Sequence, residues 1–213
     1  MPQDLSSFDN IYTHLTSTYG YPVLPRKSPR PHAPAASHSI AELSLHPTLE
    51  AILHILNADL PSAHFLCRHM QNKPAWEGMY IHGLLHRVEG DFENAKAWYG
   101  DVAHSDAFKS AWPEGLETAK EFLDDVKAAI NDGAKKPCSK DLEDLSRREI
   151  DRLSQWCKKQ FGVERVADAT TVWVEPSEKE RAMAAKMIPK VDAESKIGIA
   201  RLYNQISNDT QSQ

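Results

Sequence analysis

The chain has 213 residues, of which 41% are apolar and 26% are charged, and its formal net charge is −5. This composition is typical of a soluble protein of one or two domains with enough apolar side chains to form a core. No segment approaches the ~20 consecutive apolar residues that span a bilayer, and the first residues do not resemble a secretory signal. We therefore expect a cytoplasmic protein without membrane contact.

The charges and the cysteines exclude further classes of function. Residues 41–134 contain 15 acidic and 7 basic side chains, and basic and acidic residues are interleaved after them. A nucleic-acid-binding surface needs a dense basic patch that neutralises phosphates, which this sequence lacks, so we expect no nucleic-acid partner. The cysteines Cys67, Cys138 and Cys157 are too few and too far apart for a disulfide framework or a zinc knuckle, and we expect reduced thiols.

The first 38 residues are expected to form a short helix followed by a flexible arm. Phe8, Ile11 and Leu15 have the spacing of one apolar helix face. Five prolines lie between residues 20 and 38, where they disfavour a helix and favour an extended conformation. The pattern therefore predicts a linker over residues 20–38.

The rest of the chain is expected to be helical. Ser39 and Glu42 have the spacing of a capping box, which predicts the start of a helical core over residues 39–133. A helical extension over residues 134–213 should follow, and the whole chain should be all-α with about six to nine helices. The expected later elements are a helix from Pro113 to Gly133, a helix from Ser139 to Gly162, an extended loop held by Trp173, and two helices between residues 177 and 206.

An internal repeat relates residues 50–70 to residues 82–102. At an offset of 32 residues, His54 matches His86 and Asp59 matches Asp91. A period near 34 residues, built as helix, tight turn and helix, is typical of tetratricopeptide repeats. Residues 47–107 resemble that family, and the second copy has small, turn and aromatic residues at the family's positions: Gly83, Gly90, Phe92, Ala95 and Tyr99.

The resemblance implies antiparallel helix pairs with a groove along their first helices. This sequence departs from the family at Met79, His82 and His86, where the family has tryptophan, leucine and tyrosine. Two repeats bury too little apolar surface alone, so we expect the N-terminal helix and the C-terminal extension to cap them. The string HGLLHRVEGDFENAKAWY also resembles a segment of small fungal and bacterial proteins of unknown activity.

The favoured functional interpretation is a non-catalytic interaction module. Tyr80, Leu84 and Arg87 lie on the first helix of the second repeat and are the candidates to line its groove. The groove would bind a protein or peptide, and the acidic balance of residues 41–134 favours a basic or amphipathic partner.

The histidines His82 and His86, four residues apart on one predicted helix, have two interpretations. In the favoured one they are packing residues, because His54 has the same place in the first repeat and a repeat duplicates packing positions. This interpretation predicts no bound metal. The HExxH arrangement of metalloproteases is absent, since Gly83 follows His82.

The alternative interpretation is a small metal-dependent or acid–base enzyme. His82 and His86 would bind Zn²⁺ or Fe²⁺ with His64 or Glu89 as the third ligand and water as the fourth. His86 would act as a ligand or base beside Glu89, and Arg87 would hold an anionic substrate. The complete pocket would contain five residues: His64, His82, His86, Glu89 and Asp91.

Overall fold

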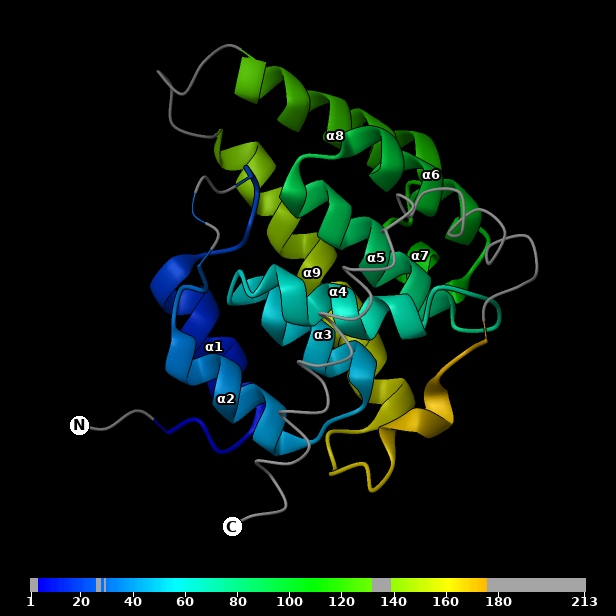
Figure 1. Ribbon diagram of the computed structural model, residues 1–213. Helices are drawn as coiled ribbons and strands as arrows, with labels where there is room; N and C mark the ends of the chain where they lie inside the picture. The colour runs from blue at the N-terminus through cyan, green and yellow to red at the C-terminus, as the bar shows by residue number, and fades with distance from the viewer. Residues whose placement is uncertain (1–3, 26–27, 29, 132–138, 176–213) are drawn as a thin grey trace, which may run out of the picture. The chain divides into compact units, whose positions relative to one another are not determined.

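The computed structural model describes residues 4–25, 28, 30–131 and 139–175, and these residues form nine α-helices, one short 3₁₀ helix and no β-strand (Figure 1). The expectation of an all-α fold is confirmed. None of the described helices is long and apolar enough to cross a membrane. The helices are α1 (Phe8–Tyr19), α2 (Pro34–Leu43), α3 (Pro47–Leu56), α4 (Leu60–His69), α5 (Trp76–Glu89), α6 (Phe92–Val102), α7 (Asp106–Ala111), α8 (Leu116–Asn131) and α9 (Lys140–Phe161), and the 3₁₀ helix is η1 (Ala169–Val172).

Two helical hairpins, α3–α4 and α5–α6, form the centre of the bundle. Gly90 ends α5 in a left-handed conformation with φ 88°, and Asp91 then caps α6 by accepting a hydrogen bond from the Asn94 backbone N–H at 3.3 Å. A Cβ atom on Gly83 would lie 2.8 Å from the Cβ of Trp98, so only glycine permits this separation of α5 and α6. The small residue at position 83 therefore marks the close approach of these two helices.

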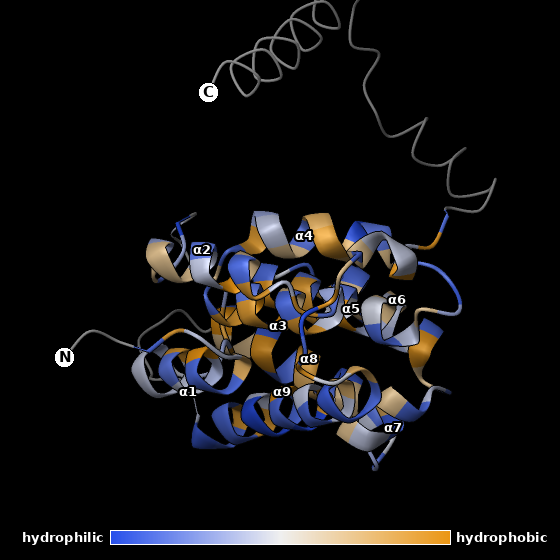
Figure 2. Ribbon diagram, turned by 90° about the horizontal axis from the view of Figure 1, so that it is seen from below, coloured by the Kyte–Doolittle hydropathy of each residue, from blue (hydrophilic) through white to orange (hydrophobic). Residues whose placement is uncertain are grey.

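The long helix α9 packs against α3, α7 and α8. Its buried stripe includes Ile150, Leu153 and Cys157, while its hydrophilic residues lie on the outside of the bundle (Figure 2). Ser139 caps its start and Gly162 ends it, as the sequence predicts. Helix α9 belongs to the same compact unit as α3–α6, the unit Met1–Glu175.

The prediction of a flexible arm over residues 20–38 is wrong for most of that segment. Helix α2 begins at Pro34, whose fixed φ suits a first helical position, and not at Ser39. Val23 is buried, and the Ala33 backbone N–H donates to Asn57 Oδ1 at 2.9 Å. The described residues before Pro34 form no helix after α1, which the prolines explain, but the carbonyls of Pro22 and Ala33 accept hydrogen bonds from distant parts of the chain.

Several local predictions also need correction. Helix α7 was not expected, and α8 begins at Leu116 instead of Pro113. The loop before Trp173 contains η1, although Trp173 does stack on His69 with ring centroids 4.1 Å apart. Cys67 and Cys157 are free and buried, as expected. The remaining expectations, at Gly133, at Cys138 and for helices between residues 177 and 206, lie outside the described residues.

Candidate functional site

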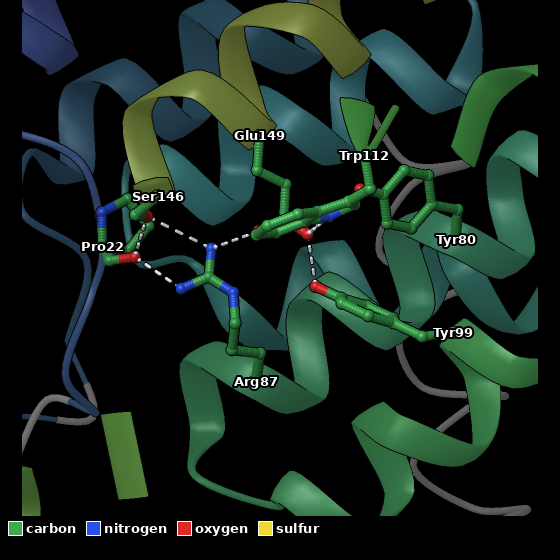
Figure 3. A network of polar contacts seen from close by, with 7 residues as sticks. All are labelled: Pro22, Tyr80, Arg87, Tyr99, Trp112, Ser146 and Glu149. Carbon is green, nitrogen blue, oxygen red and sulfur yellow. Dashed lines mark hydrogen bonds and ion pairs between the residues drawn. The ribbon is translucent and has the colours of Figure 1, made fainter. Parts of the chain in front are cut away.

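A fully buried ion pair joins α5 to α9. Arg87 and Glu149 are both 0% exposed, and a guanidinium nitrogen of Arg87 lies 3.1 Å from Glu149 Oε2. The other carboxylate oxygen, Oε1, accepts hydrogen bonds from the Tyr80 hydroxyl at 3.0 Å, the Tyr99 hydroxyl at 2.5 Å and the Trp112 indole at 3.0 Å (Figure 3). Burial, followed by the charge of Glu149, raises the pKa of both tyrosines well above 10, so they remain donors.

The same guanidinium also holds the N-terminal segment. Arg87 donates to the Pro22 carbonyl at 2.9 Å and to Ser146 Oγ at 3.2 Å, and Ser146 donates to the same carbonyl at 2.7 Å. The guanidinium carbon lies 5.2 Å from the centre of the Phe122 ring. The network therefore ties three distant parts of the chain together inside the protein.

This arrangement corrects the candidate groove. Tyr80, Leu84 and Arg87 are each 0% exposed, so a partner cannot reach them. Tyr80 and Arg87 instead contact Glu149 of α9, which covers the face expected to receive a partner helix. Arg87 is also unavailable for an anionic substrate, because Glu149 already neutralises its charge.

A second polar cluster lies between α4 and α5. Glu89 Oε1 lies 2.7 Å from His64 Nε2, and Glu89 Oε2 lies 3.2 Å from His86 Nδ1. His64 belongs to α4, whereas the other two residues belong to α5. Their side chains are 20%, 13% and 29% exposed for His64, His86 and Glu89, so solutes can reach the cluster. One ligand atom from each of the three residues lies within 4.8 Å of the others.

The electrostatics of the cluster favour an ionised carboxylate at Glu89 and a neutral ring at His82. Burial opposes ionisation of Glu89, but hydrogen bonds from His64 and His86 outweigh it and lower the pKa of Glu89 to about 2. His82 is 5% exposed; burial, reinforced by the charges of His86 and His64, lowers its pKa to about 3. Glu89 is therefore ionised and His82 neutral near pH 7.

Packing fixes the rings of the cluster. His82 stacks on Trp98 and on His86, with ring centroids 4.7 Å and 4.8 Å apart. The Asn94 amide lies 3.1 Å from His86 Nε2. The Nδ1 atoms of His64 and His82 are buried without a hydrogen-bond partner among the described residues, which is uncommon for buried polar atoms.

The repeat partner of His86 has a different environment. His54 Nδ1 lies 3.1 Å from Asp59 Oδ2, and its Nε2 lies 3.7 Å from Glu50 Oε1. Asp91, which matches Asp59 in the repeat, caps α6 and is not among the three residues whose ligand atoms meet. The repeat therefore duplicates the position of the histidine but not its partners.

The structure brings together four of the five residues of the predicted pocket: His64, His82, His86 and Glu89. His82 lies beside the group of possible ligands and not within it. Asn94 and Trp98 were not among the predicted site residues, although both follow His86 and His82 in the HGLLHRVEGDFENAKAWY string. Arg68 was not predicted either; it is an exposed residue whose charge helps to lower the pKa of His82.

Comparisons with known proteins add no family to this description: no protein-family model, no curated protein and no solved structure matches the chain.

Proposed function

We propose that the protein binds a divalent transition metal ion, Zn²⁺ or Fe²⁺, through His64, His86 and Glu89. The observation that carries the proposal is the convergence of two imidazole nitrogens and one ionised carboxylate within 4.8 Å of one another. Two histidines and one carboxylate form a common ligand set for both ions, with ligand distances of about 2.0–2.2 Å for zinc.

The surroundings of the three residues suit such a site. Three protein ligands leave a coordination position for water or a substrate, and partial exposure gives access to it. An Asn94 amide turned with its oxygen toward His86 Nε2 would hold a proton there and leave Nδ1 for the metal. The neutral ring of His82 would support His86 from the side.

Zinc titration of the protein, after removal of any affinity tag and dialysis against a chelator, tests this proposal. We expect about one equivalent of bound Zn²⁺ by calorimetry, and a loss of affinity of at least about 10-fold in Glu89→Gln and His86→Gln. His54→Gln is the matched control, since it removes the repeat partner outside the cluster.

Two results would refute metal binding. One is a wild-type protein without a saturable zinc isotherm. The other is an equal loss of affinity in His54→Gln, which would assign the effect to stability and not to ligation. Either result would favour the packing interpretation of the histidines.

We propose partner binding as a second function, at a different surface from the one that the sequence suggested. Phe65 on α4 is 56% exposed and borders a groove of about 410 Å³. The groove is also lined by the acidic residues Glu50 and Asp59, which suits a basic, amphipathic helix. A labelled helical peptide of leucine and lysine should bind, Phe65→Ala should weaken binding, and a peptide with glutamate in place of lysine should not bind. Equal binding of both peptides would refute the charge argument.

We further propose that α3–α4 and α5–α6 are two tetratricopeptide-like repeats closed by α9. Support comes from the close helix approach at Gly83 and from Asp59 and Asp91, which occupy the N-cap positions of α4 and α6. Superposition of the two hairpins in a crystal structure, and of each on known repeats, would test this assignment.

A further inference from the structure

A cavity of about 450 Å³ lies away from the histidine cluster. It is bounded by residues before and within α3, by the start of α5, by Phe161 at the end of α9, and by residues 171–175. Its volume falls in the range of about 300–1,000 Å³ that is usual for small-molecule sites. Most of the lining side chains are apolar or aromatic.

Flat aromatic surfaces form part of its wall. His46 stacks on Phe161 with ring centroids 3.8 Å apart and ring planes 1° from parallel. Trp173, which is 40% exposed, also lines the cavity and packs against His69 with the ring planes tilted by 33°. Such faces favour a planar ligand, because stacking adds to the burial of apolar area.

His46 supplies a directed hydrogen-bond donor. The Thr48 backbone N–H donates to His46 Nδ1 at 3.4 Å, and since a backbone N–H can only donate, Nδ1 must be unprotonated. Burial lowers the pKa of His46 to about 4, so the ring is neutral near pH 7 and its proton is on Nε2. His46 is 9% exposed, and its Nε2–H has no hydrogen-bond acceptor among the described residues.

The charges at the cavity exclude anions. Glu77 lines it, and one of its carboxylate oxygens accepts from the Trp156 indole at 2.9 Å. Glu175 lines it as well, and none of the lining residues in the described part of the chain is a lysine or an arginine. An anionic ligand would therefore lose its hydration without gaining an opposite charge.

We propose that this cavity binds a flat, uncharged and mostly apolar small molecule that carries one hydrogen-bond acceptor, such as a carbonyl oxygen, which accepts from His46 Nε2. The site is independent of the metal proposal, since it shares no residue with the histidine cluster.

Three matched fluorescent probes test the chemistry of the ligand. Prodan is a neutral naphthalene with a propionyl carbonyl, and we expect saturable binding with a blue shift of its emission. The dimethylaminonaphthalene without the propionyl group lacks the acceptor. Its affinity should be lower than that of prodan by a factor of about five or more. The analogue with a carboxylate in place of the propionyl group should bind at least about 10-fold more weakly than prodan.

Two variants locate the site. Trp173→Ala removes part of the wall and should weaken prodan binding about fivefold or more. His46→Phe keeps an aromatic ring against Phe161 but removes the donor, and it should abolish the preference for prodan over the probe without a carbonyl. Tyr19→Ala, an exposed aromatic outside the cavity, is the control and should leave all three affinities unchanged.

The proposal is overturned if prodan shows no saturable binding, or if it binds equally well to the wild type and to Trp173→Ala. It is also overturned if His46→Phe retains the full preference for the carbonyl probe, or if the anionic probe binds as tightly as prodan. Circular dichroism of each variant establishes that the compared proteins are folded, and Trp173→Ala, at a surface residue, provides the test if His46→Phe does not fold.

Discussion

Replacing Glu149 by glutamine should be among the most destabilising single changes in the described part of the chain. The substitution conserves shape but leaves the buried guanidinium of Arg87 without a counter-charge. The new amide can still accept from Tyr80 or Tyr99, but its NH₂ group would face or displace another donor. Removing one partner of a buried ion pair costs about 3–5 kcal/mol, and we expect that range here.

A double-mutant cycle measures this coupling directly. Urea unfolding followed by circular dichroism should give about 3–5 kcal/mol of destabilisation for both Glu149→Gln and Arg87→Met. The double variant no longer contains an unpaired charge, so its cost should be smaller than the sum of the single costs by about 2 kcal/mol or more. The matched control is Asp144→Asn, which breaks the exposed ion pair with Arg147 and should change stability little.

The reasoning fails if the single changes at Glu149 and Arg87 each cost less than about 1 kcal/mol. It also fails if the single costs simply add in the double variant. Either result would mean that water reaches the pair, or that the pair forms only part of the time, in conflict with exposures of 0% for both side chains.

Other substitutions test the packing and the pH dependence. Gly83→Ala should destabilise the protein by about 1–3 kcal/mol, because the new Cβ would lie 2.8 Å from Trp98. Gly100→Ala on α6 should stabilise it by about 0.5–1 kcal/mol, because nothing in the described part of the chain, beyond the adjoining residues and the backbone of its own helix, lies within 4 Å of the new Cβ. Urea unfolding measures both changes. The usual pKa of His46 is 6.5 and the folded value is about 4, so the unfolded state binds the proton more tightly between these values. The contribution of the neutral His46 to the free energy of unfolding is complete above pH 6.5 and is lost as the pH falls toward 4. The free energy of unfolding measured at pH 7, 6 and 5 should therefore decline less steeply in His46→Phe than in the wild type. The difference in slope should be up to about 1.4 kcal/mol per pH unit, and less where solvent screens the ring.

The parts of the fold that the sequence predicted correctly are those with local signals. Ser139 and Gly162 define the ends of α9 because capping and left-handed termination depend on one or two residues. The start of α2 was missed because the five prolines of residues 20–38 were together interpreted as excluding a helix. Pro34 is the first residue of α2, a position at which proline is compatible with a helix. Local capping signals were therefore reliable at the ends of α9, but the capping-box spacing of Ser39 and Glu42 lies inside α2, and the density of prolines was misleading.

The burial of the groove expected along Tyr80 and Arg87 could not be predicted, because the residue that contacts both, Glu149, lies more than sixty residues further along the chain. Tyr80 and Arg87 have the right positions on α5 to line a binding face, but nothing near them in sequence indicates that Glu149 will reach them. The histidine cluster was easier to predict, since His86 and Glu89 are one turn apart on α5 and His64 lies on the preceding helix. The prediction failed where burial depends on a residue distant in sequence, and it succeeded where the residues of the cluster lie on one helix and the helix before it.

The geometry of α5 explains why one helix contains both clusters. Tyr80, Leu84 and Arg87 follow the spacing i, i+4, i+7, and His82, His86 and Glu89 follow the same spacing two residues later. Two residues correspond to about 200° around a helix, so the two sets lie on nearly opposite faces. The first face is enclosed against α9 with Glu149 as its common partner, and no solute can reach it.

The second face meets α4 at a partly exposed position, where an ionised carboxylate touches two imidazoles and two imidazole nitrogens lack partners. The carboxylate of Glu89 faces His64 and His86 and has no lysine or arginine as a partner among the described residues. This face can therefore still bind a cation, whereas Arg87 and Glu149 already neutralise each other on the first face. Stability should therefore depend mainly on the Arg87 face of α5, and any binding chemistry on the His86 face. Glu149→Gln should lower the melting temperature of the protein both with and without zinc. Glu89→Gln should remove only the increase in melting temperature that zinc produces.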